Sequence, residues 1–101
     1  MDENRCLHSL GVAQKMVEIG KNKGLTPKEL NDLFTLGMVH DIGYQFGPGN
    51  MHQKLGGLVL KNNGYCYWQE VYYHGIREDE YTSLYLDILN QADMQIDKMG
   101  K

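Results

Sequence analysis

Hydrophobic residues recur along most of this chain at intervals of three and four positions, the spacing that places side chains on one face of an α-helix. The first such stretch runs from about residue 3 to residue 21 and ends at the sequence GKNKG. Its predicted inner face consists of Leu7, Leu10, Ala13 and Val17. His8 lies beside this face, so a polar side chain is expected at the edge of the core.

The second predicted helix has the clearest start signal in the chain. In the sequence TPKE, Thr26 can cap the helix, Pro27 suits its first turn and Glu29 stands three residues after the cap. The predicted core positions are Leu30, Leu33, Phe34 and Gly37. Steps of three and four residues carry the same face on to His40 and Asp41, just before a glycine-rich loop. Because an ionised carboxylate on a buried face is costly unless it is paired or bound to a metal, a cation is expected beside Asp41.

Three further helices are predicted, and each carries a histidine or an aspartate on its apolar side. A third helix, capped by Asn50, has His52 in its first turn, and a fourth ends at His74. The last runs from about residue 81 to residue 98, with Asp93 in an apolar row. No alternation typical of strands is found. The sequence therefore predicts an all-α fold, a compact bundle of about five helices.

Composition and charge narrow the possible functions. The length fits one domain over residues 1–101, and 42% hydrophobic with 23% charged residues is typical of a folded chain. A formal net charge of -3 without long runs of one sign argues against binding to a nucleic acid polymer or a membrane. The chain shows neither a membrane span nor a secretory signal, so we expect a cytoplasmic location. There, Cys6 and Cys66 are expected as free thiols packed in the core.

The polar residues on or beside apolar faces include every histidine of the chain. The set is His8, His40, Asp41, His52, His74 and Asp93. Imidazole nitrogens with carboxylate oxygens are ligands for iron, manganese, zinc, cobalt or nickel, and the lack of thiolate ligands argues against a structural zinc finger. Taken one at a time, a histidine at a helix end is also explained as a partner of the helix dipole.

The order of these residues resembles the HD superfamily of helical metal-dependent phosphohydrolases, which is named after a pair such as His40 and Asp41. The matching segments are RCLHSLGVA, GMVHDIG, MHQKLGG, VYYHG and LNQADMQID. The resemblance implies one metal ion held by His8, His40, Asp41 and Asp93. It also implies a second ion held by His52 and His74, with Asp41 as the bridge. The expected cofactor is thus a divalent transition metal, about two ions per chain, with magnesium also compatible.

The function implied by this resemblance is hydrolysis of a small, nucleotide-like phosphate ester, with His40 and Asp41 at the catalytic centre. Two divalent ions roughly 4 Å apart can hold a hydroxide as nucleophile and stabilise the charge on the leaving oxygen. Whether the enzyme is a phosphomonoesterase, a phosphodiesterase or a pyrophosphohydrolase stays open. One alternative is a metal-loaded nucleotide-binding or regulatory module without turnover, and another is oxidative chemistry at a two-iron site.

One departure from the family pattern concerns phosphate binding. Several members that act on phosphodiesters or dinucleotides carry a lysine soon after the His-Asp pair, whereas HDIG is followed here by Tyr44. By position, Arg5, Lys54 and Arg77 are candidate substitutes, each with a solvated surface charge as the alternative. Tyr44 is expected to touch substrate. So short a chain could also complete its site as a homodimer.

Overall fold

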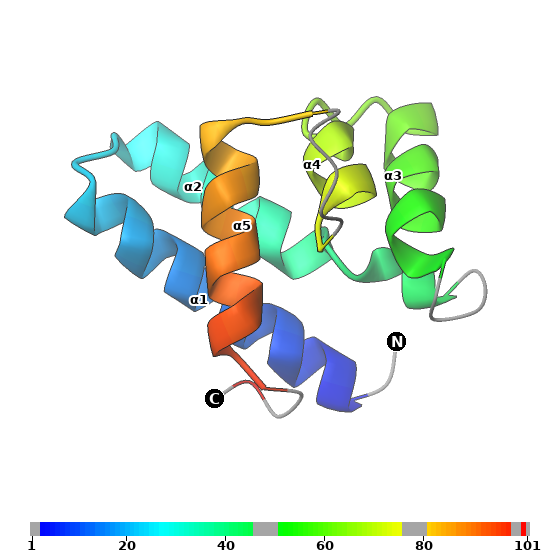
Figure 1. The fold of residues 1–101 in the computed structure, drawn as a ribbon, viewed down its shortest axis with the longest axis horizontal. Coiled ribbons are helices and arrows are strands. Elements are labelled where there is room, and N and C mark those ends of the chain that lie inside the picture. Colours follow the sequence, from blue (N-terminus) through cyan, green and yellow to red (C-terminus); the bar gives the residue numbers. More distant parts are fainter. Residues whose placement is uncertain (1–2, 46–50, 76–80, 98–99, 101) are drawn as a thin grey trace.

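The computed structural model describes residues 3–45, 51–75, 81–97 and 100 and is built from helices (Figure 1). In chain order these are α1 (Glu3–Asn22), α2 (Pro27–Val39), the short 3₁₀ helix η1 (Ile42–Gln45), α3 (His52–Asn62), α4 (Trp68–Tyr73) and α5 (Leu84–Gln95). The described residues contain no β-strand, which confirms the predicted all-α fold of about five helices. Within the same residues, no helix is long and apolar enough to cross a membrane.

The first two helices form a hairpin, and small residues let their backbones approach closely (Figure 1). A Cβ added at Gly37 of α2 would lie 2.5 Å from the Cα of Ala13 on α1. The hairpin turn is followed by the predicted capping box. The Thr26 hydroxyl accepts from the Glu29 N–H at 3.2 Å, and the Glu29 carboxylate accepts from the Thr26 N–H at 3.0 Å.

The buried face of α1 differs from the predicted one. Leu7 and Leu10 are 39% and 37% exposed, whereas Ser9, Val12 and Met16 are fully buried. Ala13 is buried as predicted, in close contact with Gly37 of α2, so the prediction is wrong at the two leucine positions and right at Ala13.

The predicted core position Phe34 in α2 is also wrong, because its side chain is 38% exposed. Leu33 and Gly37 are buried as predicted, and Leu36 is buried as well, on the side of α2 that faces the rest of the core.

The core is assembled from four of the helices. Its buried members are Val12, Met16, Leu33, Leu36, Val71, Ile88, Leu89 and Ala92. Partly buried tyrosines pack against it, and the hydroxyls of Tyr67 and Tyr85 donate to Asp32 at 3.1 and 3.3 Å. Cys6 and Cys66 are free but exposed, so their predicted packing in the core is wrong.

The remaining helix ends shift by a few residues. α5 begins at Leu84 rather than near residue 81, because Ser83 caps it by accepting from the Leu86 N–H at 3.0 Å. α3 begins at His52, and Met51 before it gives no side-chain cap. The predicted cap, Asn50, lies outside the described residues.

Candidate metal centre

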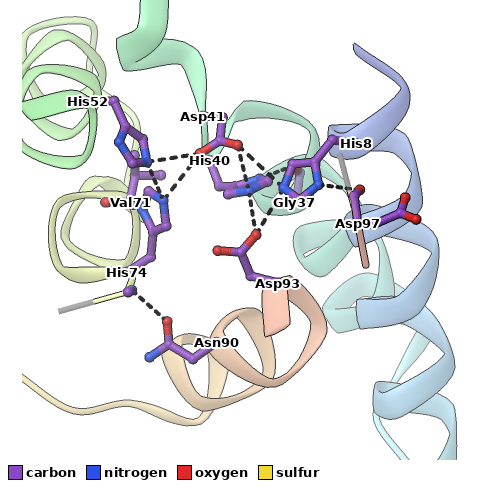
Figure 2. Close-up of polar contacts among 11 residues, drawn as sticks. His8, Gly37, His40, Asp41, His52, Val71, His74, Asn90, Asp93 and Asp97 are labelled. Carbon is purple, nitrogen blue, oxygen red and sulfur yellow. Dashed lines mark hydrogen bonds and ion pairs between the residues drawn. The ribbon is translucent and has the colours of Figure 1, made fainter. Parts of the chain in front are cut away.

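The structure brings together the six residues predicted as metal ligands (Figure 2). They are His8 in α1, His40 and Asp41 after the end of α2, His52 at the start of α3, His74 after the end of α4, and Asp93 in the last turn of α5. Five segments of the chain therefore meet at one point, and four of the six side chains come from residues just outside or at the first position of a helix.

Asp41 lies at the centre of this cluster and is only 5% exposed. Its Oδ2 is 3.5 Å from Nε2 of His8 and 3.3 Å from Nε2 of His40. Its Oδ1 is 3.1 Å from Nε2 of His52 and 3.3 Å from Nε2 of His74. The carboxylate thus presents one oxygen to each of two pairs of imidazoles.

Asp93 completes the first of these two groups. Its Oδ1 is 2.9 Å from Nε2 of His8 and 3.4 Å from Nε2 of His40. In the second group, the Nε2 atoms of His52 and His74 are 3.2 Å apart. Oxygen and nitrogen atoms suited to bind a metal therefore converge from both sides of Asp41.

Three of the imidazoles are fixed in orientation by backbone carbonyl groups. His8, His40 and His74 each direct Nδ1 at a carbonyl oxygen: that of Asp97 at 2.9 Å, of Gly37 at 2.6 Å and of Val71 at 2.5 Å. Because a carbonyl only accepts, Nδ1 carries the hydrogen and, in the neutral ring, Nε2 carries a lone pair. Lone pairs on Nε2 then face carboxylate oxygens, an arrangement that is repulsive unless a cation or a proton lies between them.

The clearest sign of a missing partner is at His40. This side chain is fully buried, and its Nε2 has no hydrogen-bond partner among the described residues, although oxygens of Asp41 and Asp93 lie 3.3 and 3.4 Å away. Buried nitrogen atoms rarely stay unpaired. An imidazole nitrogen that faces two carboxylates across such distances fits a divalent transition metal.

The electrostatics of the metal-free cluster show the same demand for positive charge. Burial lowers the pKa of His40, but the facing carboxylates of Asp41 and Asp93 outweigh burial and raise it to about 10. Burial raises the pKa of Asp41 and of Asp93, but the imidazoles around them outweigh it, so both carboxyl pKa values fall below their usual range. The hydrogen bond to Asp93 raises the pKa of His8, whereas burial lowers that of His74. Without metal, a proton takes the place of the cation.

Close backbone contacts set two of the ligands. Gly43 in η1 packs against the carbonyl oxygen of His52 so tightly that a Cβ at Gly43 could not be accommodated, and this contact holds η1 on the start of α3. After α4, the N–H of Gly75 donates to the Asn90 side chain on α5 at 2.9 Å. The segment that carries His74 is thereby tied to the helix that carries Asp93.

The segment after α5 supports the ligand on α1. The Asp97 carbonyl that holds His8 also accepts from the N–H of Gly100 at 3.0 Å. Gly100 has φ +82°, and a Cβ there would collide with the Leu7 carbonyl. A Cβ at Gly11 would in turn lie 2.6 Å from the Gly100 oxygen. Two glycines are therefore required for this close approach.

A cavity of about 240 Å³ opens over the cluster. It is lined by Arg5, His8, Asp41, Tyr44, His52 and Asp93. Among the predicted substrate-binding residues, the structure thus brings Arg5 and Tyr44 to the cavity. Lys54 is exposed on α3 and does not line it, and Arg77 lies outside the described residues.

Comparison with known proteins agrees with this arrangement. The family model for the HD domain matches residues 5–94, a span that contains all six residues of the cluster. No curated protein and no solved structure matches the chain. HD domains bind divalent metals and are generally metal-dependent hydrolases. The match covers most of the chain, and its His40-Asp41 pair lies at the centre of the cluster, so the chain belongs to the HD domain family.

Proposed function

We propose that this protein is a metal-dependent phosphohydrolase that cleaves a small, nucleotide-like phosphate ester. The observation that carries the proposal is the division of the cluster at Asp41, whose two carboxylate oxygens each face a separate pair of imidazoles at 3.1–3.5 Å. Such a division suits two ions that share one carboxylate.

The residues take different parts in this proposal. His8, His40 and Asp93 would hold one ion, His52 and His74 the other, and Asp41 both. When bound, a pair of divalent ions lowers the pKa of a water molecule and stabilises the charge that develops on a transferred phosphoryl group. Since Nδ1 of three histidines already donates to carbonyl groups, the same rings are held as ligands and not as proton carriers.

Phosphate recognition falls to Arg5, whose guanidinium group lines the cavity beside the cluster. A guanidinium group can donate two parallel hydrogen bonds to phosphate oxygens, and it keeps its charge at any physiological pH. It would supply the cation that several members of the family carry as a lysine soon after the His-Asp pair, where this chain has Tyr44.

The size of the cavity supports a small substrate. Its volume of about 240 Å³ lies below the range of about 300–1,000 Å³ that is typical of pockets for drug-sized ligands. We therefore expect the phosphate group and the adjoining sugar to be enclosed, and a base to lie at the mouth of the cavity.

The test is phosphate release from nucleoside mono-, di- and triphosphates and from phosphodiesters, with Mn²⁺, Fe²⁺, Co²⁺, Ni²⁺, Zn²⁺ or Mg²⁺. We expect release from at least one substrate, and its loss in Asp41→Asn, which keeps the side-chain volume but removes the shared carboxylate. Asp32→Asn is the matched control, because Asp32 bonds to tyrosines away from the cavity. Equal release by Asp41→Asn would contradict the mechanism.

A module that binds without turnover is the second candidate, and it is favoured by Tyr44, which stands where several members of the family carry a lysine. The same panel separates the two functions. Metal-dependent binding of a nucleotide with no phosphate release from any substrate would support the binding module and reject the hydrolase.

A further inference from the structure

An aromatic ring in the wall of the cavity contacts two functional side chains at once. The ring of Tyr44 stacks on the imidazole of His52, with the ring centroids 4.1 Å apart and an angle of 15° between the planes. The central guanidinium carbon of Arg5 lies 3.2 Å from the centroid of the same tyrosine ring. All three side chains line the cavity over the cluster.

The backbone fixes the tyrosine in this position. The N–H of Tyr44 donates to the Asp41 carbonyl at 3.1 Å, which closes the 3₁₀ turn directly after the His-Asp pair. The preceding residue, Gly43, packs against the His52 carbonyl and against the N–H of Gly56 on α3. The ring is therefore placed by the same turn that carries Asp41.

The stacked tyrosine ring restricts rotation of the His52 imidazole, which is a proposed metal ligand. Nε2 of His52 lies 3.1 Å from Oδ1 of Asp41, and a rotation of the imidazole about its Cβ–Cγ bond would move this nitrogen away from the oxygen. A parallel ring 4.1 Å away hinders such a rotation. Ligand geometry of this kind matters, since loss of the groups that orient a ligand typically weakens metal binding about 10- to 100-fold.

The contact with Arg5 restricts a long and flexible side chain. A guanidinium group over an aromatic face is attracted to the ring, more strongly where water is excluded. Arg5 and Tyr44 are both partly buried. The guanidinium group is thus held at the cavity wall before any phosphate arrives, which lowers the entropy lost on binding.

From these contacts we infer that Tyr44 is a positioning residue, which holds Arg5 for phosphate and His52 for the second metal ion through the two faces of one ring. The inference rests on the proposed function and explains why a tyrosine follows the His-Asp pair: the cation comes from α1, and the ring places it. Phosphate binding and binding of the second ion then both depend on Tyr44.

Binding of inorganic phosphate to the Mn²⁺-loaded full chain tests the first part, by titration calorimetry. We expect Tyr44→Leu to weaken phosphate binding about 2- to 30-fold, the range of a cation–π contact. The phosphate affinity of Tyr44→Phe should stay within about twofold of the wild type, because the ring is kept. Circular dichroism shows whether each variant folds, and Tyr44→Met replaces the leucine variant if that one does not. Wild-type phosphate affinity in the ringless variant would overturn this part.

A double-mutant cycle with Arg5→Gln separates positioning from direct contact. If Tyr44 acts through Arg5, Tyr44→Leu should change phosphate affinity much less in the Arg5→Gln background than in the wild type. An undiminished effect there would mean that Tyr44 itself touches the phosphate, and would overturn the positioning role.

Metal binding without substrate tests the second part. Titration of Mn²⁺ into the metal-free chain should show a weaker second ion in Tyr44→Leu and wild-type affinities in Tyr44→Phe. Unchanged affinities for both ions in Tyr44→Leu would overturn the part that concerns His52. The two proposals can fail separately. If the protein hydrolyses a substrate but Tyr44→Leu changes neither phosphate binding nor metal binding, only the inference is rejected. If Tyr44→Leu weakens both but no substrate is hydrolysed, only the proposed function is rejected.

Discussion

Removal of metal should destabilise the whole domain, because the proposed ligands meet only in the folded chain. His8 and Asp93 are 85 residues apart in the sequence, and His52 and His74 are 22 apart. The unfolded chain therefore binds an ion far more weakly than the native one. In the native chain, the ions would neutralise a carboxylate that is 5% exposed. They would also give a partner to Nε2 of the fully buried His40, which has none among the residues that the structure describes.

The size of the effect follows from mass action. A ligand that binds only the folded state stabilises it by about 2.7 kcal/mol at a free concentration of 100 times Kd. For a chain of about this length, each kcal/mol shifts Tm by about 4–8 °C. Chelation should thus lower Tm by roughly 10–20 °C per ion held at that concentration. Thermal unfolding followed by circular dichroism, with Mn²⁺ or with a chelator, measures the shift, and elemental analysis confirms that metal is removed.

Two variants make this experiment specific. Asp41→Asn should lose most of the metal-dependent shift in Tm. In either orientation of the amide, an NH₂ group replaces the oxygen that faces one of the two pairs of histidines. Asp32→Asn should lower Tm, since two tyrosine hydroxyls lose a charged acceptor, but should keep the shift. Equal Tm values of the wild type with and without bound metal, or a full shift in Asp41→Asn, would refute the reasoning.

Other predictions concern the number of ions, the support of the site and its protons. The double variant His52→Ala and His74→Ala should lower metal content from about two ions per chain toward about one, as elemental analysis would show; a wild type with one ion, unaltered in the variant, would contradict a second site. Gly11→Ala should cost about 1–3 kcal/mol in urea unfolding and weaken metal binding, because the new methyl group meets the Gly100 carbonyl; unchanged stability would contradict the close contact. Burial lowers the pKa of His40, but the facing carboxylates outweigh burial and raise it to about 10. Metal binding at pH 7 should therefore release about one proton or more, and it should strengthen as pH rises. Calorimetry in two buffers of different ionisation enthalpy would detect this proton release. No proton release would contradict the pairing of His40 with the two carboxylates.

The fold class could be predicted because helical periodicity and one strong capping box are local signals. The buried face of α1 could be predicted only in part. Ala13 and Gly37 are predicted inner positions and do meet, whereas Leu7 and Leu10 of the same predicted face are exposed. Hydrophobicity alone predicts that Leu7 and Leu10 are buried, but two helices pack most closely where their side chains are small, as at Ala13 and Gly37.

The convergence of six side chains could be anticipated from their order, but the groups that orient them only in part. The carbonyls of Gly37 and Val71 lie three residues before His40 and His74, a spacing that the end of a helix provides. The Asp97 carbonyl lies 89 residues from His8 in the sequence. Such a contact belongs to the tertiary fold and has no signature in the residues near either end.

Two explanations of a histidine at a helix end, partner of the helix terminus or metal ligand, are compatible in this structure. The last carbonyl groups of a helix lack partners within it, and Nδ1 of His40 and of His74 satisfies one such group in α2 and in α4. The same bond leaves Nε2 as the atom with the lone pair and directs it at Asp41. Each ring therefore ends a helix with one nitrogen and offers the other to an ion. A substitution that keeps the helix end, such as His74→Asn, should preserve helix content and still lose metal, which a role at the helix end alone would not predict.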